Sequence, residues 1–169
     1  MSNYGAAQMA ASWRTVRKNT IQVALDIPAE KYGFQAAPDT MTVGQMLAHV
    51  AAVTHWSEQA HFVERNSDIS GEQFGQWFGE IGKVMAGLTT KDGIVAALQS
   101  RGEAFAARLE TMTDAQLQEM VALPGGARSR LEMLLGVKEH EMHHRAQLMQ
   151  MERMLGVVPH LTRARQARA

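Results

Sequence analysis

Four segments of the chain carry apolar residues at helical spacing, and this pattern limits the fold more than any other feature of the sequence. In each segment apolar residues recur every three or four positions, as they do on one face of an α-helix. The segments cover residues 9–27, 46–63, 94–112 and 133–155. Capping-box spacing, in Thr42 with Gln45 and in Ser129 with Glu132, marks the starts of the second and fourth. The sequence therefore predicts an all-α fold, a four-helix bundle.

Two connections between these helices are long enough to hold structure of their own. The first, NSDISGEQFGQWFGEIGKVMAGLTT, is rich in glycine and aromatic residues. We expect a short, imperfect helix there, because glycine weakens any longer one. The second, TDAQLQEMVALPGGARSR, predicts one short turn of helix followed by a Pro-Gly-Gly loop. Neither shows the alternation that is typical of a strand.

The composition argues against several classes of protein. Seventeen basic residues balance seventeen acidic ones, so no overall charge favours nucleic acid or anionic lipid. The chain has no cysteine, which excludes disulfides and thiolate metal sites. No apolar run is long enough to span a bilayer or to act as a secretory signal. We expect a cytoplasmic protein without nucleic-acid or membrane partners, with one domain at residues 1–160 and a frayed basic tail at 161–169.

The segment HEMHH, residues 140–144, matches the His-Glu-x-x-His pattern of zinc proteases. Histidines four residues apart stand on the same face of a helix and can bind one ion from adjacent turns. A zinc protease also needs a third ligand further along the chain. The positions of the extended motif hold Gln147 and Gln150 instead, and the last acidic residue is Glu152. The protease interpretation therefore fails.

A third histidine comes from the second predicted helix. His140 and His144 lie on the apolar face of the fourth helix, and His49 lies on that of the second. A buried polar group without a partner costs about 1–3 kcal/mol. One divalent cation satisfies three such imidazoles together, so the sequence predicts His49, His140 and His144 as metal ligands. The alternative is three ordinary core or rim histidines, each bonded to a carbonyl or a water.

Other candidates near the site are interpreted differently. Glu141 would be the general base of a zinc protease, but its neighbours Lys138 and Arg145 suggest a surface ion pair. Four aromatic residues are candidates for the wall of a pocket: Trp56, Phe74, Trp77 and Phe78. The alternative is that they belong to the core. Histidines that we leave out of the ligand set are His55, His61, His143 and His160, with His143 expected at the surface.

Two quoted stretches resemble a known family. PDTMTVGQMLAHV, followed much later by GVKEHEMHHRAQLMQMERMLG, is similar to the DinB/YfiT-like family in motif order, separation and total length. Ala146 departs from the pattern, since many members have glycine there. The resemblance implies a four-helix bundle in up-down-down-up order, a homodimer, and a metal site at His49, His140 and His144.

The resemblance and the ligand set imply a metal-dependent enzyme that acts on a small molecule, either a thiol-dependent S-transferase or a hydrolase-like enzyme. Nitrogen ligands suit zinc or nickel, with iron or manganese as further candidates. Three neutral imidazoles leave an open position where the ion would activate a water or a low-molecular-weight thiol co-substrate. The alternative is a non-catalytic binding or structural protein in which the metal joins two helices. A fourth protein ligand would favour that alternative.

Overall fold

Most of the chain is helical, as the sequence predicts. The structure is a computed structural model that describes residues 4–168. Its longer helices are α1 (Ala6–Asp26), α2 (Val43–Ala52), α4 (Gly71–Gly87), α5 (Lys91–Glu110) and α7 (Arg130–Met154). Its shorter elements are a 3₁₀ turn (Ala29–Lys31), α3 (Thr54–Glu58), a π-helical turn (Gln59–Val63), α6 (Asp114–Gln118), β1 (Met120–Leu123), β2 (Gly126–Ser129) and α8 (His160–Gln166). Among residues 4–168, no helix is both long and apolar enough to cross a lipid bilayer.

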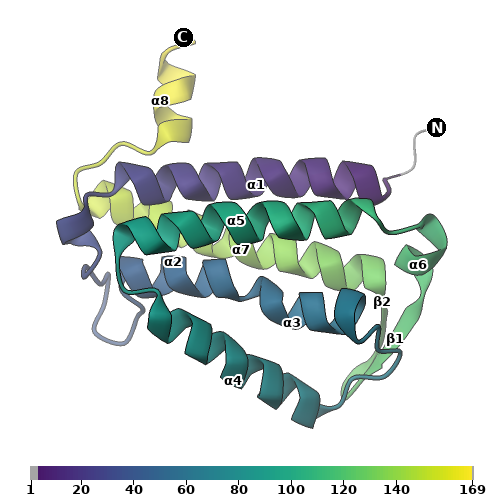
Figure 1. The fold of residues 1–169 in the computed structure, drawn as a ribbon. Helices are drawn as coiled ribbons and strands as arrows, with labels where there is room; N and C mark the ends of the chain where they lie inside the picture. Colours follow the sequence, from purple (N-terminus) through teal and green to yellow (C-terminus); the bar gives the residue numbers. More distant parts are fainter. Residues whose placement is uncertain (1–3, 169) are drawn as a thin grey trace.

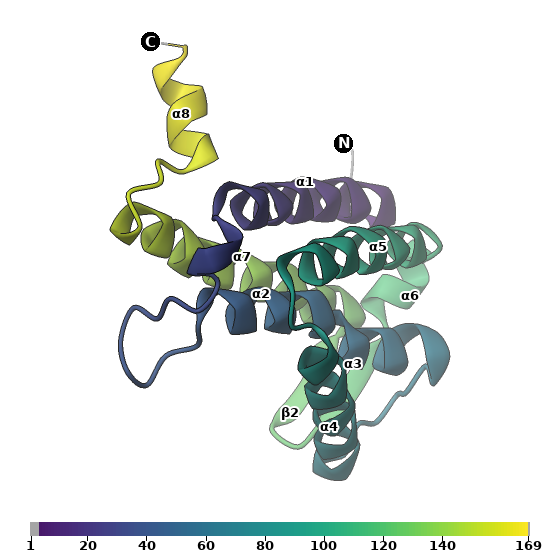
Figure 2. The ribbon, with the colours of Figure 1, turned by 60° about the vertical axis from the view of Figure 1, so that its left-hand side comes forward.

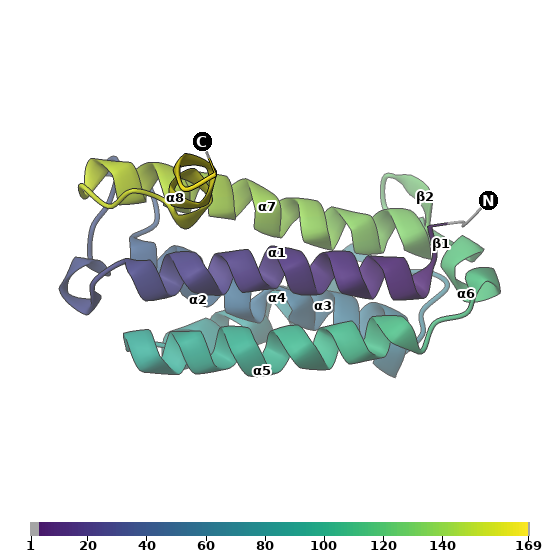
Figure 3. The same cartoon turned by 90° about the horizontal axis from the view of Figure 1, so that it is seen from above.

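The helices lie side by side along one axis. Helix α1 packs between α5 and α7, as seen from above in Figure 3, and α2 contacts both α5 and α7 beneath it. In Figure 1, α1 and α7 run from right to left, whereas α2 and α5 run from left to right. Helix α4 leans away from the others on the side of α2 and α3, and α8 projects on the opposite side (Figure 2).

The apolar faces that the spacing predicts meet in the middle of the protein. Trp13 of α1 and Phe105 of α5 pack edge to face, with ring centroids 4.8 Å apart. The indole N–H of Trp13 donates to the carbonyl of Gly102 at 2.9 Å, so this buried ring leaves no polar group unpaired. A second group of buried side chains, which includes Leu47 and Leu148, joins α2 to α7. This packing sets the distance between the two helices that carry the predicted ligands.

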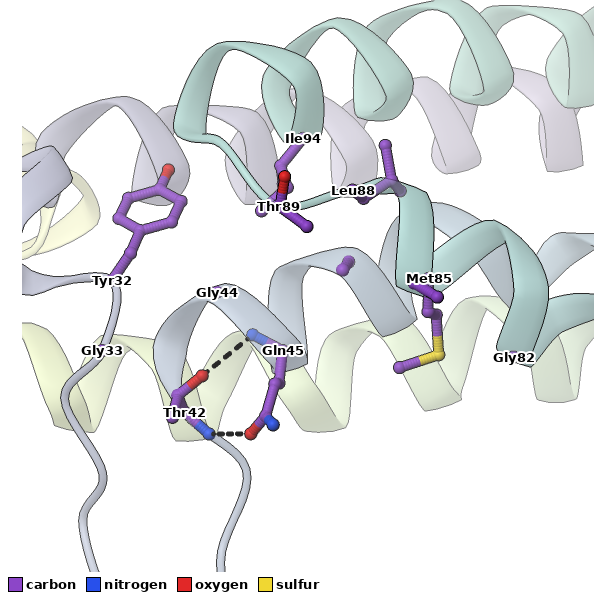
Figure 4. Close-up of a pocket in the computed structure, with 12 residues that line it drawn as sticks. Tyr32, Gly33, Thr42, Gly44, Gln45, Gly82, Met85, Leu88, Thr89 and Ile94 are labelled. Atoms are coloured by element: carbon purple, nitrogen blue, oxygen red, sulfur yellow. Dashed lines mark hydrogen bonds between the residues drawn. The ribbon is translucent and has the colours of Figure 1, made fainter.

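Both predicted capping boxes are present. The Thr42 hydroxyl accepts from the backbone N–H of Gln45, and the Gln45 side chain accepts from the N–H of Thr42, as the dashed lines in Figure 4 show. Ser129 and Glu132 make the same pair of bonds at the start of α7. The second helix is less regular than predicted, because a turn at Val53 separates α2 from α3.

Three local predictions were wrong. The first connection contains a helix of 17 residues, α4, because a capping box at Ser70 starts it and Trp77 and Ile81 bury its inner face. The second connection contains the predicted short helix, α6, but a two-stranded antiparallel hairpin follows where only a loop was expected, and β1 also pairs with the backbone at Asp68. The segment expected to fray forms α8 from His160, and Arg163 of this helix donates to Asp26 at 2.6 Å.

Candidate metal centre

The structure brings the three predicted ligands together. His49 comes from α2, while His140 and His144 occupy adjacent turns of α7. The Nε2 atom of His140 lies 3.2 Å from Nε2 of His49 and 3.1 Å from Nε2 of His144. Each residue offers one nitrogen to a group whose atoms all lie within 4.8 Å of one another. Ring nitrogens from sequence positions 91 residues apart thus converge on one point.

Hydrogen bonding alone does not satisfy this arrangement. A neutral imidazole nitrogen either donates one hydrogen or accepts one. Nε2 of His140 therefore cannot bond to His49 and His144 at the same time. Zinc binds histidine nitrogen at about 2.0–2.1 Å, which places two tetrahedral ligands about 3.4 Å apart. The observed separations of 3.1 and 3.2 Å are close to this value, so the three residues fit a divalent ion.

The protonation of the cluster also suits a metal. Burial, followed by the neighbouring histidines, lowers the pKa of His140 to about 4. Burial likewise lowers the pKa of His49 and of His144. The rings are therefore neutral at pH 7, and a metal needs such neutral imidazoles. Gln147 Oε1 lies 2.8 Å from Nδ1 of His144. Because that oxygen only accepts, the proton sits on Nδ1 and the lone pair of Nε2 faces the centre.

The cluster is less buried than the sequence suggested. All three rings are half-buried, so they lie at the wall of the protein instead of in its dry interior. His143 is exposed, as predicted. The other unassigned histidines have partners of their own: His55 pairs with Glu80, His61 with Arg130, and His160 with Asn19. Within the part of the chain that the structure describes, only the three predicted residues form a group able to hold a metal.

Two separate cavities open on the cluster. The first, which we call the aromatic pocket, has a volume of about 270 Å³ and is lined by His49, Val53, Trp56, Phe74, Phe78, Gly136, Val137 and His140. The second, the methionine pocket, has a volume of about 400 Å³ and includes His144, Gln147, Met41, Met46 and Met151. The two pockets share no lining residue. The cluster is therefore bordered by two different cavities.

The aromatic residues named from the sequence divide between pocket and core. Trp56, Phe74 and Phe78 line the aromatic pocket. Trp77 is only 1% exposed and belongs to the core, where its indole N–H donates to Glu64. A larger cavity, about 560 Å³, lies elsewhere, between Tyr32 and the ends of α2 and α4 (Figure 4). None of the three histidines lines it.

Comparison with known proteins identifies the family of this chain. The model of the DinB superfamily matches residues 12–148, which include all three histidines. The chain belongs to the DinB superfamily. The crystal structure of the DinB-like protein YjoA from Bacillus subtilis has a TM-score of 0.68 to this DinB chain at 19% identity. The match covers 88% of this chain and 92% of that one, and it shows a shared fold. Comparison with curated proteins gave no match.

Glu141 is the residue of this DinB protein that the sequence placed wrongly. It is 1% exposed and forms a buried ion pair with Arg17 of α1 instead of a surface pair with Lys138 or Arg145. Arg17 stands four residues after Trp13, on the same face of α1. This spacing indicates that Arg17 lies on the buried face of α1. Sequence reasoning missed it because arginine side chains are mostly found at the surface.

Gln147 is the second residue that sequence reasoning missed. It lies three residues after His144, which is the spacing of neighbours on a helix surface. Its amide oxygen accepts from Nδ1 of His144 and fixes that ring with Nε2 toward the other two histidines. Among residues 4–168, nothing hydrogen-bonds to the buried Nδ1 atom of His140, so the other α7 histidine has no equivalent support.

Proposed function

We propose that this DinB-superfamily protein is a metal-dependent enzyme acting on a small molecule, with His49, His140 and His144 as the ligands of one divalent ion. The observation that carries the proposal is the convergence of three Nε2 atoms that hydrogen bonding cannot satisfy together. The cavities beside them support catalysis over a structural role, because a purely structural zinc site is closed by four protein ligands.

The histidines, Gln147 and the aromatic side chains have different roles in the proposed site. When bound, a divalent ion supplies Lewis acidity, which lowers the pKa of a water or thiol that it binds. The three neutral imidazoles hold it and leave its double charge uncompensated, and Gln147 keeps the ring of His144 in place. Trp56 and Phe74, with ring centroids 5.9 Å apart, form an apolar wall beside His49 and His140. This wall makes one side of the site apolar.

Between the two reaction classes, we favour a thiol-dependent S-transferase over a hydrolase. A transfer between two organic molecules needs two binding spaces at one centre, and the aromatic and methionine pockets supply two. A low-molecular-weight thiol from outside suits a chain that has no cysteine of its own. Zinc or nickel is the ion we propose, on the preference of imidazole for these metals.

Metal titration of point variants tests the ligand set. We expect the purified protein to bind one zinc or nickel ion, and His49→Ala or His140→Ala to lose stoichiometric binding. His143→Ala is the matched control, because His143 is exposed on the same helix. Full binding in the first two variants would refute the ligand assignment. A screen of low-molecular-weight thiols with electrophilic acceptors, run on the metal-loaded protein, then tests the reaction. Metal binding without turnover in that screen would favour the non-catalytic alternative.

We also propose that α1, α2, α5 and α7 form the up-down-down-up bundle that the family resemblance implies. The shared direction of α1 with α7, and of α2 with α5, supports this order (Figure 1). The implied homodimer is a further proposal. Sedimentation at micromolar concentration tests it, and a purely monomeric protein would count against it.

A further inference from the structure

The aromatic pocket has an uncharged lining. Six of its lining residues are apolar or glycine, and its two polar members are the ring nitrogens of His49 and His140. No charged side chain lines it within the described residues. Away from the histidines, a charged group buried there would have no charge partner among the lining side chains, at a large cost in free energy. The pocket therefore favours a neutral group.

The shape of the pocket favours a flat group of ring size. Phe74 and Phe78 are stacked, with ring centroids 6.2 Å apart and 21° between their planes. Trp56 stands against Phe74 at 5.9 Å. A cavity of roughly 150 Å³ already accepts a benzene ring, so the volume of about 270 Å³ holds a substituted ring.

Gly136 is the residue that keeps this space open. It lies inside the 25-residue helix α7, one turn before His140 and on the same face. A glycine inside a helix costs roughly 0.5–1 kcal/mol relative to alanine. Packing within the chain does not require a glycine at this position, because a Cβ at Gly136 would meet no heavy atom within 4 Å among the described residues. What its missing side chain does leave is free volume in the pocket beside a metal ligand.

We infer that the aromatic pocket binds the uncharged, flat apolar part of the substrate, and that Gly136 sets the size of the group it accepts. The inference deepens the proposed function, since it names the substrate class of the same site. The reacting atom of such a molecule would lie at the end of the pocket where His49 and His140 face it.

Binding of three small probes tests the charge preference. Benzyl alcohol, benzoate and benzylammonium share a ring and differ in charge. Their binding to the metal-free protein is followed by the indole N–H signals of the three tryptophans in two-dimensional NMR. We expect benzyl alcohol to shift the Trp56 signal and to leave those of Trp13 and Trp77, which are 1% exposed, in place. The charged probes should bind at least about tenfold more weakly. Equal binding of all three probes, or no Trp56 shift with any of them, would overturn the inference.

Two variants test the role of Gly136. Gly136→Val should weaken benzyl alcohol binding about tenfold by filling the pocket, while the protein still binds zinc. Gly79→Val is the matched control, because Gly79 lies in α4 outside the pocket and its Cβ also meets nothing within 4 Å in the described structure. Unchanged affinity in Gly136→Val would refute the assignment. If that variant does not fold, Phe78→Ala replaces it: Phe78 is 52% exposed, and the truncation should weaken binding without unfolding the protein.

The outcomes separate this inference from the metal proposal. Probe binding at Trp56 in a protein that never binds zinc would contradict the metal site and leave the pocket in place. Zinc binding at His49, His140 and His144 without discrimination between the probes would contradict only the pocket.

Discussion

Arg17 and Glu141 form an ion pair inside the protein, with Nη2 of Arg17 2.8 Å from Oε2 of Glu141. Their side chains are 3% and 1% exposed. The same guanidinium donates to the backbone carbonyl of Val50 at 3.2 Å. Val50 follows His49, and Glu141 follows His140. One side chain of α1 is therefore bonded to both helices that carry the histidine cluster, in each case one residue from a histidine of the cluster.

Removing one partner of this pair should destabilise the fold strongly. We expect Arg17→Met to lower the free energy of unfolding by about 3–5 kcal/mol, because it leaves the buried carboxylate of Glu141 without its charge partner. The double variant Arg17→Met/Glu141→Leu should recover most of that loss, since apolar side chains of similar size need no partner. Urea denaturation of the three proteins measures both effects. A single variant as stable as the parent would show that the pair contributes nothing.

Gly102 should not tolerate a side chain. A Cβ at Gly102 would lie 2.6 Å from Cγ of Arg17, closer than two carbons can approach. We expect Gly102→Ala to lower the free energy of unfolding by about 1–3 kcal/mol through this overlap. Gly79→Ala is the control, because Gly79 is also helical but faces open space. It should instead stabilise the protein by about 0.5–1 kcal/mol. Thermal or urea unfolding distinguishes the two, and equal effects would contradict the close approach.

Zinc should stabilise the folded protein through the histidine cluster. At a free concentration 100 times its Kd, a ligand that binds only the native state adds about 2.7 kcal/mol to the free energy of unfolding. We expect an increase of this order in the parent protein and in His143→Ala, measured by urea denaturation with and without zinc. His140→Ala should show no increase. Equal zinc stabilisation in His140→Ala would place the ion somewhere else.

Glu152 should make stability fall as the pH rises. Both its carboxylate oxygens are buried, and no hydrogen-bond partner for them exists among residues 4–168. Burial and then Asp26 raise the pKa of Glu152 to about 7, although Arg163 and Arg153 act in the opposite direction. A carboxyl whose pKa is higher in the folded state than in the unfolded state favours folding when it is protonated. Its contribution to the free energy of unfolding is complete below the unfolded pKa of about 4.5 and is lost as the pH rises to about 7.

The variant Glu152→Gln removes this titration. It should exceed the parent protein in stability at pH 8 by up to about 3 kcal/mol, from 1.36 kcal/mol per unit of pKa shift. At pH 4 the two proteins should be nearly equal. Urea denaturation at both pH values measures the difference. A difference between parent and variant that does not change with pH would show that Glu152 titrates normally.

Local patterns in the sequence were enough to predict most of the helices and the three histidines that cluster in the structure. Apolar spacing and capping boxes depend on residues three or four apart, so the sequence identifies α1, α5 and α7 and the starts of α2 and α7. His49, His140 and His144 could be named because each lies on an apolar face, where an imidazole needs a partner. The length of α4 and the hairpin of β1 and β2 were missed, because tertiary packing there overrides weak local preferences.

What only the tertiary structure decided is how distant side chains meet. The sequence determined that three imidazoles share a bundle face, but the 3.2 Å between His49 and His140 depends on how α2 packs against α7. The burial of Glu141 depends likewise on an arginine 124 positions away in the chain. Periodicity reports which face of its own helix a residue occupies. It carries no information about the partner that another helix brings to that face, and that partner decides whether a charge is paired, a ring is a ligand or a glycine opens a pocket.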